Sequence, residues 1–566
     1  MTGIPRFLAP LPIARQLAGY DGGVFRKDLL AGVTVGVILI PQGMAYALVA
    51  GLPPIYGLYT SLVPLVVYAF LGTSRQLAVG PTALASLLTA SAVAPIAGGD
   101  AAKFVALAIL LAFMAGIVQI VLGLVRAGFL ANFLSRPVLA GFTSAAAVII
   151  GLGQIKHLLG ISIPRSDHAT EIAASVFVRL GESHLPTLAI GIGALLIMIA
   201  FRQWKKTFPA ALVALVAGTA ITAILHLDGQ GVAIVGMVPS GLPAPQIPRA
   251  SVAEIRALLP GMFTILAIGI IETIAVAKYY ASRNGYEIDA DKELIALGAA
   301  KILGAVFQAY PNTGGFSRTA VNADAGARTQ IATLIAATVV ALALLFLTPL
   351  FFFIPKAVLG AIIILAVWSL FDFHEVAYLW KVDRKDFALM AITFFSTALL
   401  GIETGILVGI VSSLAVVLHS SSRPHTAVMG RLPGTDTWRN VDRYPDAITE
   451  PGVVVLRLDA SLYFANAGYF KSTVSRVVRE NPGIKVLVLD LYPVNRIDSS
   501  ALHALQEQVG MLREEGVSVL FAGAKGPIRD RILRAGIVAK FGADAFFHEV
   551  SDASKEAVVR IGVVDN

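Results

Sequence analysis

The chain has 566 residues, of which 56% are hydrophobic and 14% are charged, and its formal net charge is +8. Soluble proteins carry about a quarter charged residues, so this composition excludes an ordinary soluble protein and predicts one that crosses a membrane repeatedly. The absence of cysteine excludes disulfides and thiolate metal sites. We expect the positive charge in cytoplasmic loops rather than on a surface that binds nucleic acid.

The first 420 residues predict a short leading segment and a long membrane domain. Residues 1–28 lack the compact apolar core and cleavage site of a signal peptide, and we expect them to be cytoplasmic. Basic residues fall in alternate connections of residues 29–420, on the side of the N-terminus, so both termini are expected in the cytoplasm. About fourteen apolar runs predict membrane spans: 30–48, 56–72, 80–97, 103–125, 129–153, 186–201, 208–226, 258–280, 292–309, 316–325, 329–347, 352–369, 385–401 and 404–420.

The two halves of this domain carry matching irregularities. Residues 29–226 and 258–420 hold about seven spans each, and an odd number of spans makes the second repeat inverted relative to the first. One apolar span in each half is interrupted, by IPQGMAYA (40–47) in the first and by Glu272 in the second. Interrupted and unusually short spans at matching positions of two repeats are typical of a transporter's binding site.

The third and tenth spans are short and predict half-helices, each preceded by extended backbone. The first follows Gly80-Pro81 and the second follows Gly314-Gly315. Because the repeats are inverted, we expect the two helix N-termini to face each other near the middle of the membrane. Each N-terminus has unpaired N–H groups and about half a positive charge, so the pair predicts a site for an anion.

After Ser420 the composition resembles that of a soluble protein. Residues 421–451 are polar, contain several proline and glycine residues, and predict a linker. Residues 452–566 predict a small α/β domain, because amphipathic helical stretches alternate with short β-branched runs. The runs are 453–459, 485–491 and 517–523.

Several long motifs make the chain resemble the SulP (sulfate permease) family of anion transporters. They are DLLAGVTVGVILIPQGMAYALVAGLPPIYGLYTS (28–61), GTSRQLAVGPTALASLL (72–88) and YEIDADKELIALGAAKILGAVFQAYPNTGGFSRTAVNADAGARTQ (286–330). LYFANAGYF (462–470) and DSSALHAL (498–505) resemble the family's cytoplasmic STAS domain. The resemblance implies a seven-plus-seven inverted repeat divided into core and gate domains, an elevator-like movement, and a homodimer.

Arg318 and two hydroxyl residues are candidates for the anion site. An arginine inside a span costs about 2.5–3.5 kcal/mol on insertion scales and usually has a function. We expect Arg318 to supply a fixed positive charge, the alternative being a side chain that extends toward the cytoplasm. Ser317 is expected to donate a hydrogen bond to the anion or to cap the helix, and Thr82 is the matching donor on the opposite half-helix.

Glu272 is the only acid in its apolar span. Burial favours the neutral form of a carboxyl group, so Glu272 is a candidate proton carrier, the alternative being a structural hydrogen bond or an ion pair with Arg318. Gln42 and Tyr46 lie four residues apart, hence on one face of the first span. Both match family positions that line the pocket, and we expect both to contact the substrate.

The STAS-like region contains one candidate regulatory residue. The serine that matches Ser499 is a phosphorylation site in bacterial anti-sigma-factor antagonists, which share the STAS fold, so Ser499 is a candidate for phosphorylation, which would add negative charge at a helix N-terminus. The alternative is that Asp498 or Ser499 only caps the helix, and Ala501 stands where related domains usually have glycine.

These residues predict a secondary active transporter of a small anion, which is sulfate, bicarbonate or a dicarboxylate, driven by proton symport in a bacterial cytoplasmic membrane. The alternatives are an anion exchanger, a sodium-coupled bicarbonate symporter and an uncoupled anion channel. The sequence has no Walker A loop, and we expect neither enzyme activity nor a cofactor or metal. The expected partners are the anion, a coupling proton or sodium ion, the lipid bilayer, a second copy of the chain and a cytoplasmic regulator.

Overall fold

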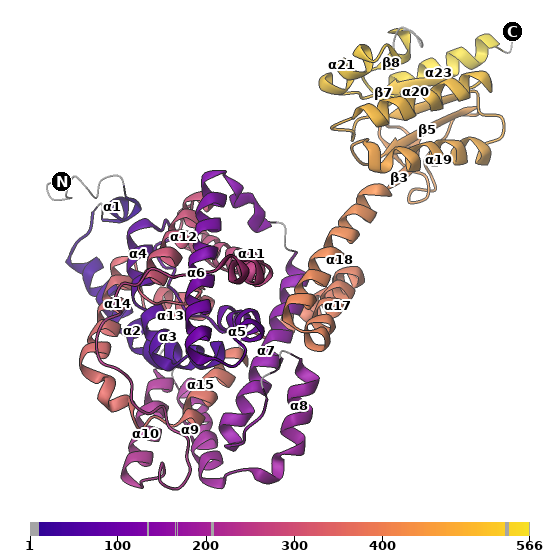
Figure 1. The fold of residues 1–566 in the computed structure, drawn as a ribbon. Helices are drawn as coiled ribbons and strands as arrows, with labels where there is room; N and C mark the ends of the chain where they lie inside the picture. The colour runs from indigo at the N-terminus through magenta and orange to yellow at the C-terminus, as the bar shows by residue number, and fades with distance from the viewer. Residues whose placement is uncertain are drawn as a thin grey trace. The chain divides into compact units, whose positions relative to one another are not determined.

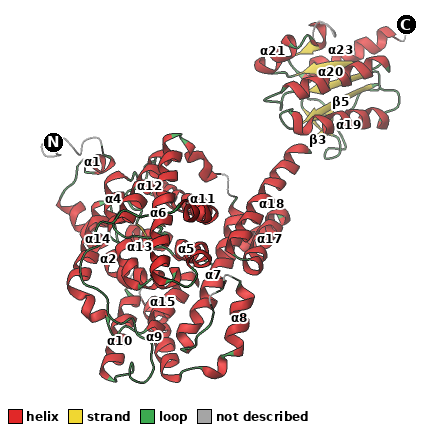
Figure 2. Cartoon of the chain, in the orientation of Figure 1, coloured by secondary structure: helices red, strands yellow, loops and turns green. Residues whose placement is uncertain are grey.

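The computed structural model describes residues 11–17, 19–132, 135–164, 166, 168–204, 209–368, 370–537 and 543–564. The chain divides into two compact units, residues 1–413 and 414–566 (Figure 1). The first unit is helical apart from two short strands, whereas the second contains a six-stranded sheet flanked by helices (Figure 2).

The first repeat of the membrane unit runs to residue 224. Its elements are α1 (Pro12–Gln16), α2 (Gly22–Ala50), α3 (Pro54–Thr60), α4 (Val63–Leu71), β1 (Val79–Gly80), α5 (Ala83–Ala97), α6 (Ala101–Leu124), η1 (Ala127–Asn132), α7 (Arg136–Leu159), α8 (Ala169–Val178), η2 (Leu180–Glu182), α9 (Leu185–Trp204) and α10 (Ala210–Ile224).

The second repeat begins after a long connection. Its elements are α11 (Val252–Arg283), α12 (Ala290–Val306), β2 (Thr313–Gly314), α13 (Phe316–Asp324), α14 (Ile331–Leu342), η3 (Ala343–Leu347), η4 (Thr348–Phe351), α15 (Lys356–Trp368), α16 (Phe373–Val382), α17 (Arg384–Leu400) and α18 (Ile402–Ser422).

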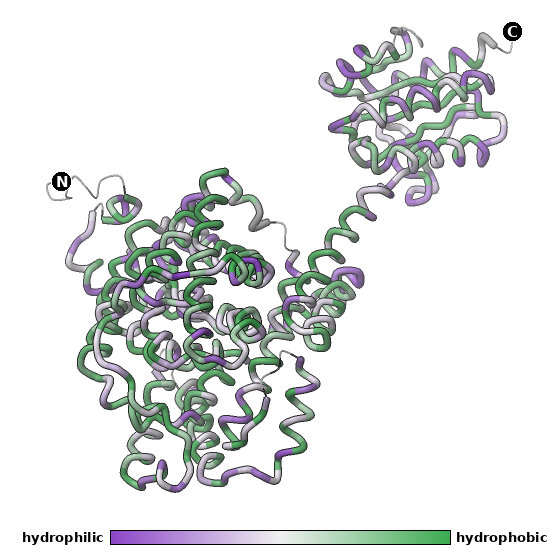
Figure 3. The backbone as a smooth tube through the Cα atoms, viewed as in Figure 1, coloured by the Kyte–Doolittle hydropathy of each residue, from purple (hydrophilic) through white to green (hydrophobic). Residues whose placement is uncertain are grey.

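Every predicted span overlaps one of these helices, with α3 and α4 together forming the second span. Among the described residues, eight helical segments are long and apolar enough to cross a membrane by themselves. The half-helices α5 and α13 are shorter, with 15 and 9 residues. Hydrophobic residues cover most turns of the membrane helices, as the green stretches of Figure 3 show. The chain therefore has the predicted polytopic helical fold.

Two local predictions about this unit need correction. The sequence predicts interruptions of the first span at Pro41 and of the eighth at Glu272, but α2 and α11 run continuously through both positions. A proline within a span is tolerated when neighbouring groups and local adjustments satisfy the freed carbonyl group. The short apolar helix α8 (Ala169–Val178) was not predicted.

Helices of the two repeats pack in pairs and form two bundles. In the first bundle α2 packs on α14, α6 on α12, and α5 on α11. In the second bundle α7 packs on α15 and α17. These bundles correspond to the core and gate domains that the family resemblance implies, and the half-helices α5 and α13 belong to the core (Figure 1).

The second unit is an α/β domain. Its elements after α18 are β3 (Thr426–Arg431), β4 (Trp438–Asn440), β5 (Val453–Leu458), α19 (Phe464–Glu480), β6 (Val486–Asp490), α20 (Ser499–Glu514), β7 (Ser518–Ala522), α21 (Gly526–Arg534), η5 (Ala543–Ala545), β8 (Phe546–Phe547) and α23 (Val550–Val564).

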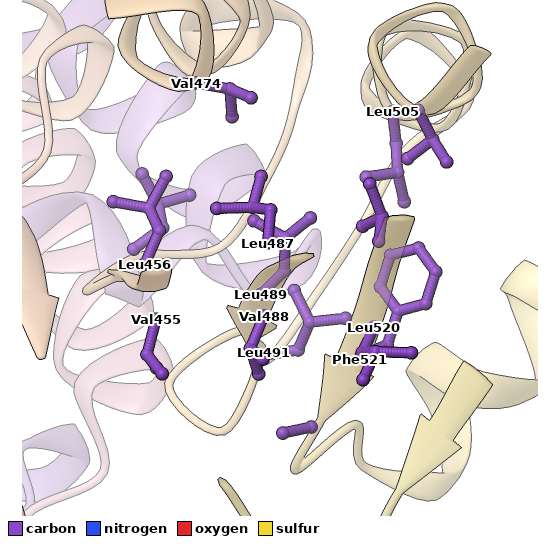
Figure 4. Close-up of a cluster of buried hydrophobic side chains, with 14 of the residues drawn as sticks. Val455, Leu456, Val474, Leu487, Val488, Leu489, Leu491, Leu505, Leu520 and Phe521 are labelled. Atoms are coloured by element: carbon purple, nitrogen blue, oxygen red, sulfur yellow. The ribbon is translucent and has the colours of Figure 1, made fainter. Parts of the chain in front are cut away.

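The sheet of this domain has the strand order β4-β3-β5-β6-β7-β8, and β5 to β8 run parallel. The three predicted strands are β5, β6 and β7. In Figure 4, Val455 and Leu456 of β5 point to opposite sides of the sheet, and Leu456 points to the side of Val474 on α19. Strands β3 and β4 lie within the predicted linker, residues 421–451, so part of this segment belongs to the sheet.

Candidate functional site

A short antiparallel strand pair joins the two repeats where the half-helices begin. Val79 of β1 pairs with Gly314 of β2, and Gly80 pairs with Thr313. Because the strands are antiparallel, α5 and α13 leave the pair in opposite directions, and their N-termini remain near the same point. This is the arrangement that the inverted repeat, Gly80-Pro81 and Gly314-Gly315 predict.

Threonine side chains fix the start of α5. Thr82 is the N-cap residue, and its Oγ1 accepts a hydrogen bond from the backbone N–H of Ala85 at 3.3 Å. The same hydroxyl group lies 2.9 Å from Oγ1 of Thr313, so one hydrogen bond links the two repeats beside the helix N-terminus. In α13 the N-cap residue is Gly315, and Ser317 lies within the first turn rather than at the cap.

A cavity of about 550 Å³ opens at these two N-termini. Its wall is built from α2, α5, α7, α11, α13, α15 and α16, which belong to both bundles. Five of the six residues predicted for substrate binding and proton coupling line this cavity: Tyr46, Thr82, Glu272, Ser317 and Arg318.

The guanidinium group of Arg318 lies between the two half-helices. Its Nη1 donates a hydrogen bond to the carbonyl oxygen of Pro81, and the residue is only 2% exposed. Its Nε and Nη2 have no hydrogen-bond partner within the described part of the chain. A Cβ atom on Gly315 would lie 2.9 Å from Nη2, so the guanidinium group packs closely against this glycine. Arg318 therefore points into the protein interior.

Glu272 faces the same cavity from α11. Its Oε2 is buried without a hydrogen-bond partner among the described residues, and the described residues include no ion pair between Glu272 and Arg318. Ser317 is exposed to the cavity, and Tyr46 is 6% exposed. The five predicted residues thus bring one guanidinium group, one carboxyl group and three hydroxyl groups to the cavity.

Gln42 is the predicted binding residue that the structure does not bring to the cavity. It lies on α2 one turn before Tyr46, and its Oε1 is buried without a hydrogen-bond partner in the described residues. Gln42 was grouped with Tyr46 because the two share a helix face and match family positions that line the pocket, but the cavity reaches only the later turn.

Sequence reasoning missed several residues of the cavity wall. Tyr279 and Phe316 are about half exposed and stand 6.3 Å apart by ring centroids. Arg136 from the start of α7 and two acids near α16, Asp372 and Glu375, complete the polar part of the wall. The position of Phe316 beside Ser317 was a usable signal, whereas Arg136 and the acids come from distant segments that no local pattern connects.

A second and larger cavity, of about 680 Å³, lies toward the other end of α5. Leu84 lines the first cavity and Leu87, one turn later, lines the second, so α5 passes from one to the other. The second cavity is mostly apolar and contains the cationic side chains of Lys156 and Lys356, with no acid among its lining residues.

In the α/β domain, Asp498 caps α20. Its Oδ1 accepts a hydrogen bond from the N–H of Ala501 at 2.9 Å, and its Oδ2 accepts one from the N–H of Phe464 at 2.9 Å. Ser499 is the first residue of the helix and is exposed. Asp498 therefore performs the capping role that the sequence left open between the two residues.

Comparison with known proteins agrees with this fold. The model of the sulfate permease family matches residues 25–393, and the STAS domain model matches residues 444–553. Sulfate transporter 4.1, chloroplastic, of Arabidopsis thaliana is 42% identical over 547 residues, which cover 94% of this chain and 79% of the relative. A probable sulfate transporter of Mycobacterium tuberculosis is 36% identical over 533 residues, covering 94% and 95%.

One solved structure resembles nearly the whole chain, and another resembles about two thirds of it. The murine Slc26a9 anion transporter in the inward-facing state has a TM-score of 0.90 and 25% identity, covering 99% of this chain and 96% of its own. The transmembrane domain of the cyanobacterial bicarbonate transporter BicA has a TM-score of 0.61 and 24% identity, covering 70% and 98%. The relatives are named as transporters, not enzymes. The chain belongs to the sulfate permease family and is an anion transporter with a C-terminal STAS domain.

Proposed function

We propose that the chain transports sulfate together with a proton, and that the anion binds between the N-termini of α5 and α13. The observation that carries this proposal is the cavity in which Arg318 and both helix N-termini face one unpaired carboxyl group, Glu272. Unpaired N–H groups of Arg318 and the hydroxyl groups of Thr82 and Ser317 supply donors for the oxygen atoms of a tetrahedral anion. Sulfate is chosen because the similar relatives are named as sulfate transporters.

The charges at the site favour a dianion when a proton is also bound. Arg318 contributes one positive charge, and each helix N-terminus contributes about half of one. Counting only Arg318, the two helix N-termini and Glu272, the charges sum to about +1 with Glu272 ionised and to about +2 with Glu272 protonated. The wall residues Arg136, Asp372 and Glu375 are outside this sum. Among the counted groups, a dianion is balanced only when Glu272 is protonated, so we propose that binding of sulfate and binding of a proton favour each other. This coupling makes proton symport our choice over sodium coupling.

Alternating access follows from two cavities at opposite ends of α5. In this proposal the core moves relative to the gate in an elevator-like manner and carries the anion from one cavity to the other. Lys156 and Lys356 would give the second cavity a positive potential that attracts anions. We further propose a homodimer in a bacterial cytoplasmic membrane with both termini in the cytoplasm, the side on which the basic connections lie.

The proposal is tested by uptake of radiolabelled sulfate, bicarbonate and fumarate into proteoliposomes, with and without an inward proton gradient. We expect the gradient to drive accumulation of sulfate above its external concentration. Uptake that responds only to anions loaded inside would make the protein an exchanger, and uptake that a sodium gradient drives would replace the proton as coupling ion. Sulfate uptake that only equilibrates across the membrane, and that responds to none of these gradients, would indicate a channel.

A further inference from the structure

A further polar cavity, of about 350 Å³, lies within the α/β unit. The proposed transport function does not use it. It is formed by the start of β3, by β4 and the turn that follows, and by the end of β5. The side chains used in the argument below are His425, Arg439, Arg443, Tyr444, Arg457 and Asp459.

Asp459 organises one side of this cavity. Its Oδ2 lies 2.8 Å from Nδ1 of His425, and its Oδ1 lies 2.7 Å from Nε of Arg457. It is the only carboxylate among the lining residues, which include three arginines. Arg457 and His425 are therefore held in place, and the single negative charge of Asp459 is already shared between them.

The other two arginines remain available. Arg439 on β4 and Arg443 in the turn after it are both exposed, and neither forms an ion pair with a carboxylate in the described residues. Placing several guanidinium groups around one cavity is unfavourable unless an anion compensates their charge. Arginine presents a planar set of donors that matches phosphate oxygen atoms in pairs, and Tyr444 adds a hydroxyl group to the lining.

The site is close to the end of the last membrane helix along the chain. His425 follows Ser422, the last residue of α18, by three positions. Three residues span at most about 10 Å, so along the chain the cavity begins close to the end of the last predicted membrane span. A phosphate group can arrive there on a lipid headgroup or on a soluble molecule.

We propose that this cavity binds a phosphate group, with Arg439 and Arg443 as its principal donors and Arg457, positioned by Asp459, at its base. The site is separate from the transport site and does not depend on the identity of the transported anion.

The test measures binding to the full-length protein in two arms. In the soluble arm, inorganic pyrophosphate is titrated into protein held in phosphatidylcholine nanodiscs. In the lipid arm, native mass spectrometry counts phosphatidic acid molecules that remain bound. We expect the double variant R439Q/R443Q to lose about tenfold or more in affinity in whichever arm binds, because each guanidinium group makes charge-assisted hydrogen bonds.

Two controls isolate the cavity. The double variant R479Q/R529Q removes the same charge from exposed positions on α19 and α21, outside the cavity, and is expected to bind like the parent protein. Arg318→Ala removes the cation of the transport site and should also leave this binding intact. If R439Q/R443Q loses binding only in the lipid arm, the ligand is a lipid headgroup. If R439Q/R443Q loses binding in the soluble arm, the ligand is a free phosphate. Absence of binding in both arms, or equal loss in R479Q/R529Q, would overturn the proposal.

Discussion

Two glutamates of the membrane unit, the buried Glu293 and the partly buried Glu272, lie in different environments. Glu293 accepts hydrogen bonds from the Tyr68 hydroxyl group at 2.6 Å and from the N–H groups of Thr73 and Ser74 at 2.6 and 3.0 Å. Glu272 has no such partners for its Oε2 and faces a cavity. The first acid holds α12 against the loop after α4, whereas the second is the acid to which we assign the coupling proton in the proposed function.

Replacement of Glu272 should therefore separate transport from proton coupling. We expect Glu272→Gln to keep sulfate exchange, because glutamine resembles the protonated acid, and to lose accumulation driven by a proton gradient. Glu293→Gln is the matched control. It should lower the free energy of unfolding by about 1–3 kcal/mol, while sulfate uptake by the protein that remains folded is still driven by the proton gradient. Gradient-driven uptake by Glu272→Gln equal to that of the parent would rule out its coupling role.

Two arginines line the described part of the cavity. Arg318 lies between the half-helices, and Arg136 lies at the start of α7. We expect Arg318→Ala to weaken sulfate binding about 10–100-fold, since charge-assisted hydrogen bonds contribute about 1.5–3 kcal/mol each. The sulfate affinity of Arg318→Lys should fall between those of the parent protein and of Arg318→Ala, because lysine keeps the charge but loses the paired donors. The measurement is the sulfate concentration at half-maximal uptake, with size-exclusion chromatography as the check on folding. Parent-like uptake by a folded Arg318→Ala protein would exclude this role.

At the scale of elements, close contact between the repeats depends on small residues. A Cβ atom on Gly298 of α12 would lie 2.7 Å from the carbonyl oxygen of Gly116 on α6, and neither backbone can move away easily. Gly298→Ala should therefore lower stability by about 1–3 kcal/mol, seen as a lower thermal midpoint of the purified protein. Gly193→Ala on α9, where no atom lies within 4 Å of the added Cβ atom, should not lower it. Equal midpoints for the two variants would show that the helices separate without cost.

The start of α20 allows a second test at this scale. Asp498→Ala should destabilise the α/β domain by about 0.5–2 kcal/mol, because it removes the cap and the hydrogen bond to Phe464. Ser499→Ala should have little effect on stability, since Asp498 is the cap residue. Chemical denaturation followed by the fluorescence of Trp438, which lies in this domain, measures both variants. A larger loss in Ser499→Ala than in Asp498→Ala would contradict this assignment.

At the scale of the whole molecule, the membrane spans and the half-helices could be predicted from the apolar runs and the repeated motifs of the sequence. Long apolar runs identified the spans, and Gly80-Pro81 and Gly314-Gly315 identified the starts of the half-helices. The cavity residues Arg136, Asp372 and Glu375 were missed because their proximity arises from packing between distant helices. Strands β3 and β4 were missed because their segment is polar and broken by proline and glycine, and pairing with β5 decides their conformation.

The most direct test of the account is to record proton entry and sulfate entry together in the same proteoliposomes, using an internal pH dye and radiolabelled sulfate. The account predicts that adding external sulfate acidifies the interior in parallel with its uptake, and that Glu272→Gln abolishes the acidification while sulfate exchange continues. Sulfate uptake by the parent protein without any accompanying acidification would contradict proton-coupled transport at this site.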